Sequence, residues 1–213
     1  MPTDTKEQGK VILKLLVKAH SDAPTTYLNH NNAFEMLIST LLSAHTTDAS
    51  VNKVTPELFS KYPGPREMAK AEIDDLIPII RTVGTYNRKS EYIKKASEIL
   101  VERYNGEVPK TIDELIVLPG VSRKTSNVVL SVVFGINEGV VVDTHIGRVT
   151  QRLGLTEQTK PDKIEKDLME MLPRDKWYEY ARLAGAHGRR ICDAKKPKCA
   201  VCTLNHLCPS AVL

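Results

Sequence analysis

The sequence has no apolar run approaching the ~20 consecutive residues that a membrane-spanning helix needs. Its N-terminal stretch, MPTDTKE, is polar and lacks the apolar region of a secretory signal. Cysteine is absent before position 192. These absences argue against a membrane protein and against a secreted fold held by disulfides along its length. We therefore expect a cytoplasmic protein with no membrane partner.

Positive charge is in slight excess but unevenly distributed. The formal net charge is +4. Between Arg182 and Lys198 a single acid, Asp193, stands among six basic residues, namely Arg182, Arg189, Arg190, Lys195, Lys196 and Lys198. Such a cluster is typical of a phosphate-binding surface. Charge alone leaves a solvated helix end and loop as the alternative.

Apolar residues recur with helical spacing along most of the chain. The stripes predict helices near 11–19, 34–42, 51–58, 93–100, 128–133, 164–171 and 175–190. The expected helix starts are Asn32, Asp48, a capping box of Thr111 with Glu114, and Pro161, and the expected stops are Gly106 and Gly135. The run Val140–Val142 favours a strand but has no plausible strand partner, so we expect an extended connector. The sequence predicts an all-α fold.

The segment from Leu118 to Thr125 reads LPGVSRKT and predicts a tight turn between two helices. Gly120 allows backbone to approach a ligand closely. The N–H groups of Val121, Ser122 and Arg123 are then expected to open the next helix, where unpaired donors suit an anion such as a DNA phosphate. An ordinary corner between two helices is the alternative.

Simple geometry can bring a lysine and an aspartate together beside this turn. A helix over 122–134 is about 20 Å long at ~1.5 Å per residue. An extended return over 135–142 covers about 25 Å at ~3.3 Å per residue. Asp143 is therefore able to reach the start of the helix that carries Lys124.

All four cysteines lie near the C-terminus, in the order Cys192-x6-Cys199-x2-Cys202-x5-Cys208. Their clustering favours metal ligation over disulfides. Four thiolates suit either Zn²⁺ or a [4Fe–4S] cluster, and spacing alone leaves that choice open. A Cys₃His zinc site that includes His206 is a further alternative.

Several segments together resemble the endonuclease III family over about Phe34 to Pro209. They are Leu118–Arg148, Leu41–Ala44, Asp48–Lys53, Tyr86–Lys89 and Asn105–Pro109. The resemblance implies a six-helix barrel domain over 26–135, with a helix–hairpin–helix at 112–134. It also implies a second helical domain, made of 1–25 and 136–213, that carries a [4Fe–4S] cluster loop over 192–208. In that loop the four cysteines would be the ligands, and Lys195, Lys196 and Lys198 would face DNA.

The resemblance also implies a reaction. Lys124 would be the nucleophile and Asp143 the catalytic carboxylate of a DNA glycosylase with abasic-site lyase activity. The carboxylate would stabilise positive charge developing at the sugar C1′, and the amine would form a Schiff base there. The amine must be neutral to attack, and we expect burial and the positive end of its helix to favour that form. A surface lysine and an aspartate that only caps the next helix are the alternatives.

The chain departs from the family pattern at positions expected to touch DNA. Ser122 replaces the second hairpin glycine, and serine can still cap the helix. His45 and Thr85 stand where relatives carry a gap-filling glutamine and an aliphatic wedge. Ser39 lies near the catalytic glutamate position of adenine-mismatch glycosylases. With Lys124 present, this favours a bifunctional enzyme that removes oxidised pyrimidines.

The expected partner is double-stranded DNA containing damaged bases or abasic sites, bound by a monomer. In a prokaryote the protein would be associated with the nucleoid. Asp48 and His145 are expected at the lesion pocket. The alternatives are a non-catalytic helix–hairpin–helix DNA-binding module, a mismatch glycosylase of the same superfamily and, from the cysteines alone, a ferredoxin-like electron carrier.

Overall fold

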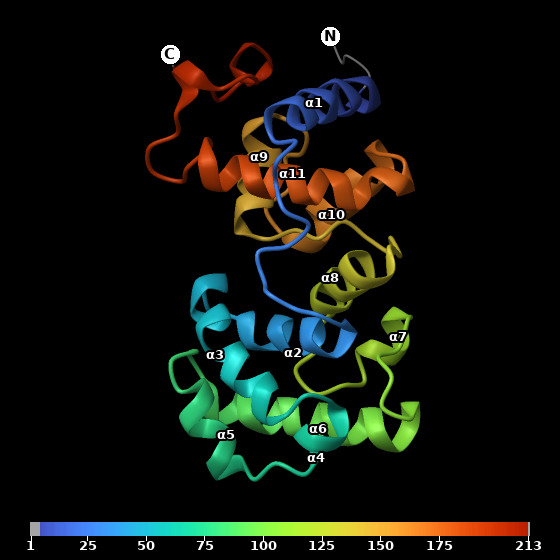
Figure 1. Cartoon of the computed structure of the whole chain (residues 1–213). Coiled ribbons are helices and arrows are strands. Elements are labelled where there is room, and N and C mark those ends of the chain that lie inside the picture. The colour runs from blue at the N-terminus through green and yellow to red at the C-terminus, as the bar shows by residue number, and fades with distance from the viewer. Residues whose placement is uncertain (1–4, 213) are drawn as a thin grey trace. The chain divides into compact units, whose positions relative to one another are not determined.

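The computed structural model describes residues 5–212 and contains helices but no strand in that range (Figure 1), which confirms the predicted all-α fold. The α-helices are α1 (Thr5–Ala19), α2 (Ala33–Ser43), α3 (Asp48–Lys61), α4 (Pro65–Ala69), α5 (Ile73–Ile80), α6 (Tyr86–Tyr104), α7 (Ile112–Leu115), α8 (Arg123–Phe134), α9 (Thr144–Arg152), α10 (Pro161–Met171) and α11 (Trp177–Arg190). Short 3₁₀ turns occur at Arg174–Lys176, Cys199–Val201 and Asn205–Leu207. Val140–Val142 is irregular backbone, as expected of a connector.

The chain forms two compact units. One comprises Thr26–Ile136, and the other combines the residues up to Thr25 with those from Asn137 onward. We call them the central unit and the terminal unit. No helix in the described range is long and apolar enough to cross a membrane.

The central unit is built around α2. Every residue from Phe34 to Leu42 is buried, and α2 contacts α3, α6 and α8. A helix that is apolar nearly all round must lie inside its domain, which confirms the expected central helix. The long helix α6 packs against α4 and α5 on another side of this core.

Side-chain caps and left-handed residues set the ends of these helices. Asn32 caps α2 as predicted, because its side chain accepts a hydrogen bond from the N–H of Glu35. The prediction that Asp48 caps α3 is wrong. The Thr47 side chain accepts from the N–H of Ser50 instead, so Asp48 is the first helical residue. Left-handed Asn105 and Gly106 end α6, at the predicted stop.

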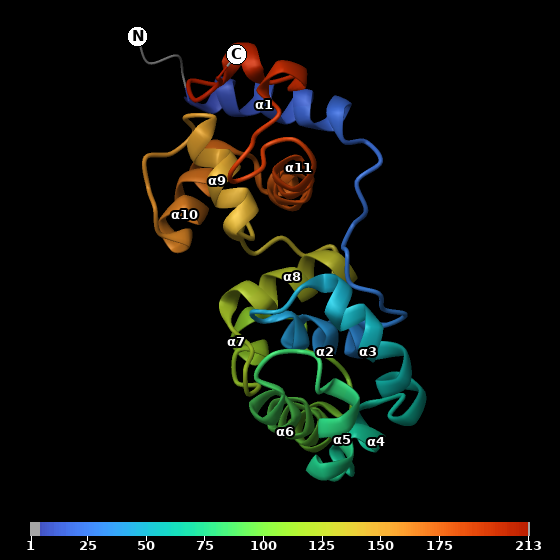
Figure 2. The same ribbon diagram turned by 90° about the vertical axis from the view of Figure 1, so that its left-hand side faces the viewer.

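The terminal unit packs helices from both ends of the sequence. Figure 2 looks along α11, with α1, α9 and α10 around it, and α11 contacts both α9 and α1. Pro161 stands at the start of α10, as predicted. The predicted helix near 175–190 is a 3₁₀ turn at Arg174–Lys176 followed by α11. Tyr180 of α11 is fully buried in this core.

Candidate functional site

The turn between α7 and α8 depends on Gly120. Its φ of +78° lies in the left-handed region, and a Cβ there would stand 2.4 Å from Cδ2 of Tyr92. The N–H of Val121 donates to the carbonyl of Leu118 at 3.1 Å and so closes the turn. The prediction that the Val121 N–H is unpaired is therefore wrong. Glycine is required here both for its conformation and for the close approach of Tyr92.

Ser122 caps α8, as predicted for the residue that replaces the second hairpin glycine. Its Oγ accepts from the N–H of Thr125 at 3.2 Å, and its carbonyl accepts from the N–H of Ser126 at 2.9 Å. Arg123 and Lys124 follow in the first turn of α8 and are exposed. The expectation that Lys124 is buried is wrong. The buried positions of α8 begin at Ser126, so its first turn extends beyond the packed part of the helix.

Asp143 begins α9. Its Oδ1 accepts from the N–H of His145 at 2.9 Å and of Ile146 at 2.8 Å, so it caps the helix, the role that the sequence analysis gives as the alternative. Its Oδ2 lies 3.6 Å from Nη2 of Arg189, and the side chain is 21% exposed. Two backbone donors and the positive end of the helix therefore hold a carboxylate in one orientation at a partly open position. Lys124 belongs to the central unit and Asp143 to the terminal unit, so their meeting stays a prediction.

Arg148, which the sequence reasoning missed, ties α9 to the end of α11. Its guanidinium donates to the carbonyl of Gly188 at 2.8 Å and to that of Cys192 at 3.0 Å. It also lies 3.3 Å from Nδ1 of His145, which is partly buried. The i, i+3 spacing of His145 and Arg148 was the available signal.

Three exposed residues of the central unit have left-handed backbone although none is glycine, namely His45, Thr85 and Asn105, the last of which ends α6. His45 has φ 54° and Thr85 has φ 58°. Such strain is concentrated at functional sites. Buried Lys89 fastens the loop after α2, donating from Nζ to the carbonyl of Leu42 and to Oγ1 of Thr46, each at 2.8 Å.

Lys89 also contacts the residue before α6, because its backbone N–H donates to the carbonyl of Thr85 at 3.1 Å. Burial lowers the pKa of the Lys89 ammonium. The sequence reasoning missed Lys89, since a lysine in the first turn of a helix reads as a surface residue. Asp48, predicted near the pocket, begins α3 and is partly buried.

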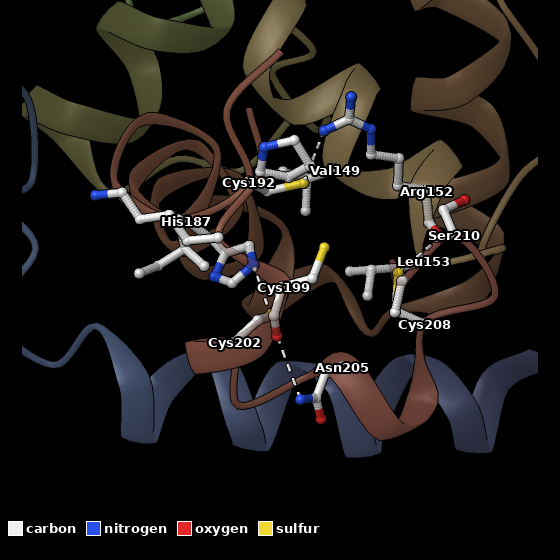
Figure 3. A pocket seen from close by; sticks show the side chains of 14 residues that line it. Val149, Arg152, Leu153, His187, Cys192, Cys199, Cys202, Asn205, Cys208 and Ser210 are labelled. Atoms are coloured by element: carbon white, nitrogen blue, oxygen red, sulfur yellow. Dashed lines mark hydrogen bonds between the residues drawn. The ribbon is translucent and has the colours of Figure 1, made fainter. Parts of the chain in front are cut away.

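The four cysteines line one pocket of the terminal unit (Figure 3). All are free thiols of intermediate burial. Val149, Leu153 and Ile191 supply apolar lining, and Arg152 supplies positive charge. His206 is exposed and is not among the lining residues. Within residues 5–212, no three His, Cys, Asp or Glu side chains are grouped so that they hold a single metal ion.

Polar groups reach the sulfur atoms from several sides. Arg152 Nη1 lies 3.4 Å from Cys192 Sγ, and Cys208 Sγ donates to the carbonyl of Arg152 at 3.1 Å. His187 Nε2 lies 3.6 Å from Cys202 Sγ. Burial raises the pKa of the Cys202 and Cys208 thiols.

His187 in turn contacts His20, which follows α1. Burial lowers the pKa of His20, and burial together with the neighbouring His20 lowers the pKa of His187 to about 4. The sequence reasoning missed this pair, because 167 positions separate its members.

The six residues of the basic cluster divide into three parts, and one of these is Arg189, whose Nη2 lies 3.6 Å from Oδ2 of Asp143. Arg182 donates to the carbonyl of Ala23 at 2.5 Å, and Arg190 pairs with Asp22 at 2.7 Å, so both are tied to the segment after α1. Exposed side chains are presented by Lys195, Lys196 and Lys198. Oδ1 of Asp193 accepts from the N–H groups of Lys195 and Lys196, at 2.9 and 3.1 Å, and shapes their loop. Of the six basic residues expected to form one patch, only these three lysines lie in the cysteine loop.

Residues 38–174 match the model of the HhH-GPD superfamily, described as a base excision DNA repair protein. This match covers more than half of the chain and defines its class. Endonuclease III of Synechocystis sp. is 44% identical over 206 residues, which are 97% of this chain and 94% of that protein. Endonuclease III of Bacillus subtilis is 42% identical over 182 residues, covering 85% and 83%.

A solved structure of a trapped endonuclease III–DNA covalent intermediate has a TM-score of 0.92 at 42% identity and covers 99% of this chain and 98% of that one. The chain therefore belongs to the endonuclease III family, and it is a base-excision-repair DNA glycosylase and lyase.

Proposed function

We propose that Lys124 and Asp143 carry the reaction of this enzyme on damaged double-stranded DNA. The observation that carries this proposal is the place of Lys124 in the first turn of α8, directly after the Gly120 turn. An exposed amine at this place is accessible to a sugar carbon when DNA lies on the hairpin. The similar endonuclease III structure is a covalent intermediate with DNA, which is the kind of species that a lysine nucleophile forms.

In the proposed mechanism the damaged nucleotide leaves the base stack, because C1′ cannot be attacked inside a stacked duplex. The Lys124 amine adds to C1′ as the glycosidic bond breaks and the base leaves. The carboxylate of Asp143 stabilises the positive charge that develops at the sugar. Opening of the sugar ring gives the Schiff base, and loss of a C2′ proton then expels the 3′ phosphate. The strand breaks without net oxidation or reduction.

Oxidised pyrimidines are the proposed lesions. Ser39, near where adenine-mismatch glycosylases carry a catalytic glutamate, is fully buried in α2, and its Oγ donates to the carbonyl of Asn29 at 3.5 Å. This position supplies no carboxylate, so the chemistry depends on Lys124 and Asp143. His45 and Thr85, on strained exposed loops, are proposed to probe the DNA beside the lesion.

The proposed cofactor is a [4Fe–4S] cluster held by Cys192, Cys199, Cys202 and Cys208. Four thiols around one pocket match the ligand set of such a cluster, and Arg152 offsets the negative charge of thiolate ligands. When bound, the cluster would cross-link the C-terminal loop. The loop itself would present Lys195, Lys196 and Lys198 to DNA phosphates.

The proposed partner is double-stranded DNA that contains damaged bases or abasic sites, bound by a monomer in the cytoplasm or, in a prokaryote, at the nucleoid. Gly120, Val121, Ser122 and Arg123 form the proposed phosphate-binding hairpin. His145 and Asp48 remain proposed members of the pocket.

Borohydride trapping tests the assignment of the nucleophile. Wild-type protein on DNA with thymine glycol or an abasic site should give a covalent adduct, and Lys124→Ala should abolish it. Lys166→Ala, which removes an exposed lysine of α10, should trap like wild type. No wild-type adduct would instead support a non-catalytic DNA-binding module, and an adduct with Lys124→Ala would remove Lys124 from its role.

A further inference from the structure

A chain of three side chains leads from the end of α1 to the cysteine pocket. His20 and His187 are 3% and 2% exposed, and their rings meet edge to face with centroids 5.1 Å apart. His20 Nε2 lies 2.9 Å from His187 Nδ1, and His187 Nε2 lies 3.6 Å from Cys202 Sγ. Figure 3 shows His187 beside the cysteines of the pocket. None of these contacts is required by the reaction at Lys124.

Which nitrogen donates in each of these contacts follows from where the ring protons of His20 and His187 lie. Two ring nitrogens 2.9 Å apart need one donor and one acceptor between them, and an imidazole with a single proton has one nitrogen of each kind. His20 Nδ1 is buried and has no hydrogen-bond partner among the described residues. A buried N–H without an acceptor is costly, so the proton of His20 belongs on Nε2, where His187 Nδ1 accepts it. His187 must then carry its own proton on Nε2, the nitrogen nearest to Cys202 Sγ.

We propose that His20 acts through His187 as a positioning residue for the cluster, holding an N–H···S hydrogen bond on the ligand Cys202. This inference rests on the proposed [4Fe–4S] cluster. A hydrogen bond to a ligand sulfur stabilises negative charge there and so favours the reduced state, which raises the reduction potential. A residue that hydrogen-bonds a histidine at a metal site commonly fixes the tautomer and orientation of that histidine. His20 does so for His187.

Voltammetry and resonance Raman spectroscopy of the iron-loaded full chain test the hydrogen bond. His20→Leu and His187→Leu should each shift the reduction potential to more negative values, and the double variant should shift it no further than His187→Leu. The Fe–S stretching bands should move on transfer to D₂O in wild type and move less in both variants, which keep the contact of Arg152 with Cys192. His206→Leu, an exposed histidine outside the pocket, should change neither reading.

A rescue variant separates the relay from simple packing. Gln in His187→Gln carries an amide donor whose proton does not depend on His20. It should restore most of the potential, and His20→Leu should then have no effect in that background. If His187→Leu does not fold, His20→Leu in the wild-type and His187→Gln backgrounds still decides the matter.

The outcomes also separate this inference from the proposed function. Normal iron content with an unchanged potential in His20→Leu overturns the relay alone. Zinc, or no metal, in purified wild-type protein overturns the cluster and the relay with it. Borohydride trapping at Lys124 on the same samples reports the proposed catalysis independently of both results.

Discussion

Gly120 shows how a single residue can be required for two separate reasons. Gly106 and Gly120 both have positive φ, of +85° and +78°. A Cβ at Gly106 would meet no atom within 4 Å, whereas one at Gly120 would collide with Tyr92. A substitution at Gly106 therefore adds backbone strain alone, whereas one at Gly120 adds both backbone strain and steric overlap.

We expect Gly106→Ala to lower the free energy of unfolding by ~1 kcal/mol, the cost of a left-handed L-residue. Gly120→Ala should cost a further ~2 kcal/mol, because the added methyl overpacks the contact with Tyr92. Urea unfolding measures both values. The double variant Gly120→Ala/Tyr92→Ala should recover part of the added loss, and equal costs for the two alanine variants would contradict the steric argument.

Lys124 and Lys89 differ in burial although both lie in the first turn of a helix. A lysine in the first turn of a helix was predicted to be buried at 124 and passed over at 89, and the structure has the opposite arrangement. Lys124 is the second residue of α8, and Lys89 is the fourth residue of α6. The difference lies in whether another helix end, here the carbonyl of Leu42, stands opposite the ammonium group.

At the scale of elements, α9 and α11 share a buried polar contact between Tyr180 and Thr150. The hydroxyl of Tyr180 lies 2.9 Å from Oγ1 of Thr150, which also donates to the carbonyl of Ile146. Burial raises the pKa of the Tyr180 phenol above its ordinary value. This contact makes the packing of the two helices sensitive to alkaline pH.

Whether stability rises or falls with pH follows from which state, folded or unfolded, keeps the phenol proton of Tyr180. Above pH ~10 an unfolded tyrosine loses its proton, while folded Tyr180 keeps it, so stability falls as pH rises. Tyr180→Phe should cost ~1 kcal/mol at pH 7 through the lost hydrogen bond, and should make the decline above pH 10 less steep. Unfolding in urea at pH 7 and at pH 10–11 measures this. An equally steep decline in the variant would exclude Tyr180 as a source.

Helix ends were the most predictable elements. Asn32, Ser122, Thr111 and Asp143 cap their helices as their side chains predict, since a cap acts over three residues of chain. At α3, Thr47 and Asp48 are adjacent residues that can both cap. Thr47 takes the role in the structure, and Val51 and Leu58 are buried further along the same helix.

For the whole molecule, the testable property is its response to salt. If Lys195, Lys196 and Lys198 each contact one phosphate, replacing all three by Gln should reduce the slope of log affinity against log salt by ~2.7, at ~0.9 per contact. Fluorescence anisotropy with a duplex that carries an abasic-site analogue measures the slope. The matched triple variant of Lys160, Lys163 and Lys166 to Gln should keep the wild-type slope. If the variant of Lys195, Lys196 and Lys198 also kept the wild-type slope, these three lysines would not contact DNA.

By itself the sequence determined the helices, the hairpin and the order of the cysteines, because periodicity, caps and turn residues act over a few positions. It also carried the resemblance through which Lys124 and Asp143 were proposed. Only the tertiary structure showed that Lys124 is exposed, that Arg182 and Arg190 are tied to the segment after α1, and that His20 reaches His187. These features depend on partners far away in the chain, and such contacts exist only once the helices have packed.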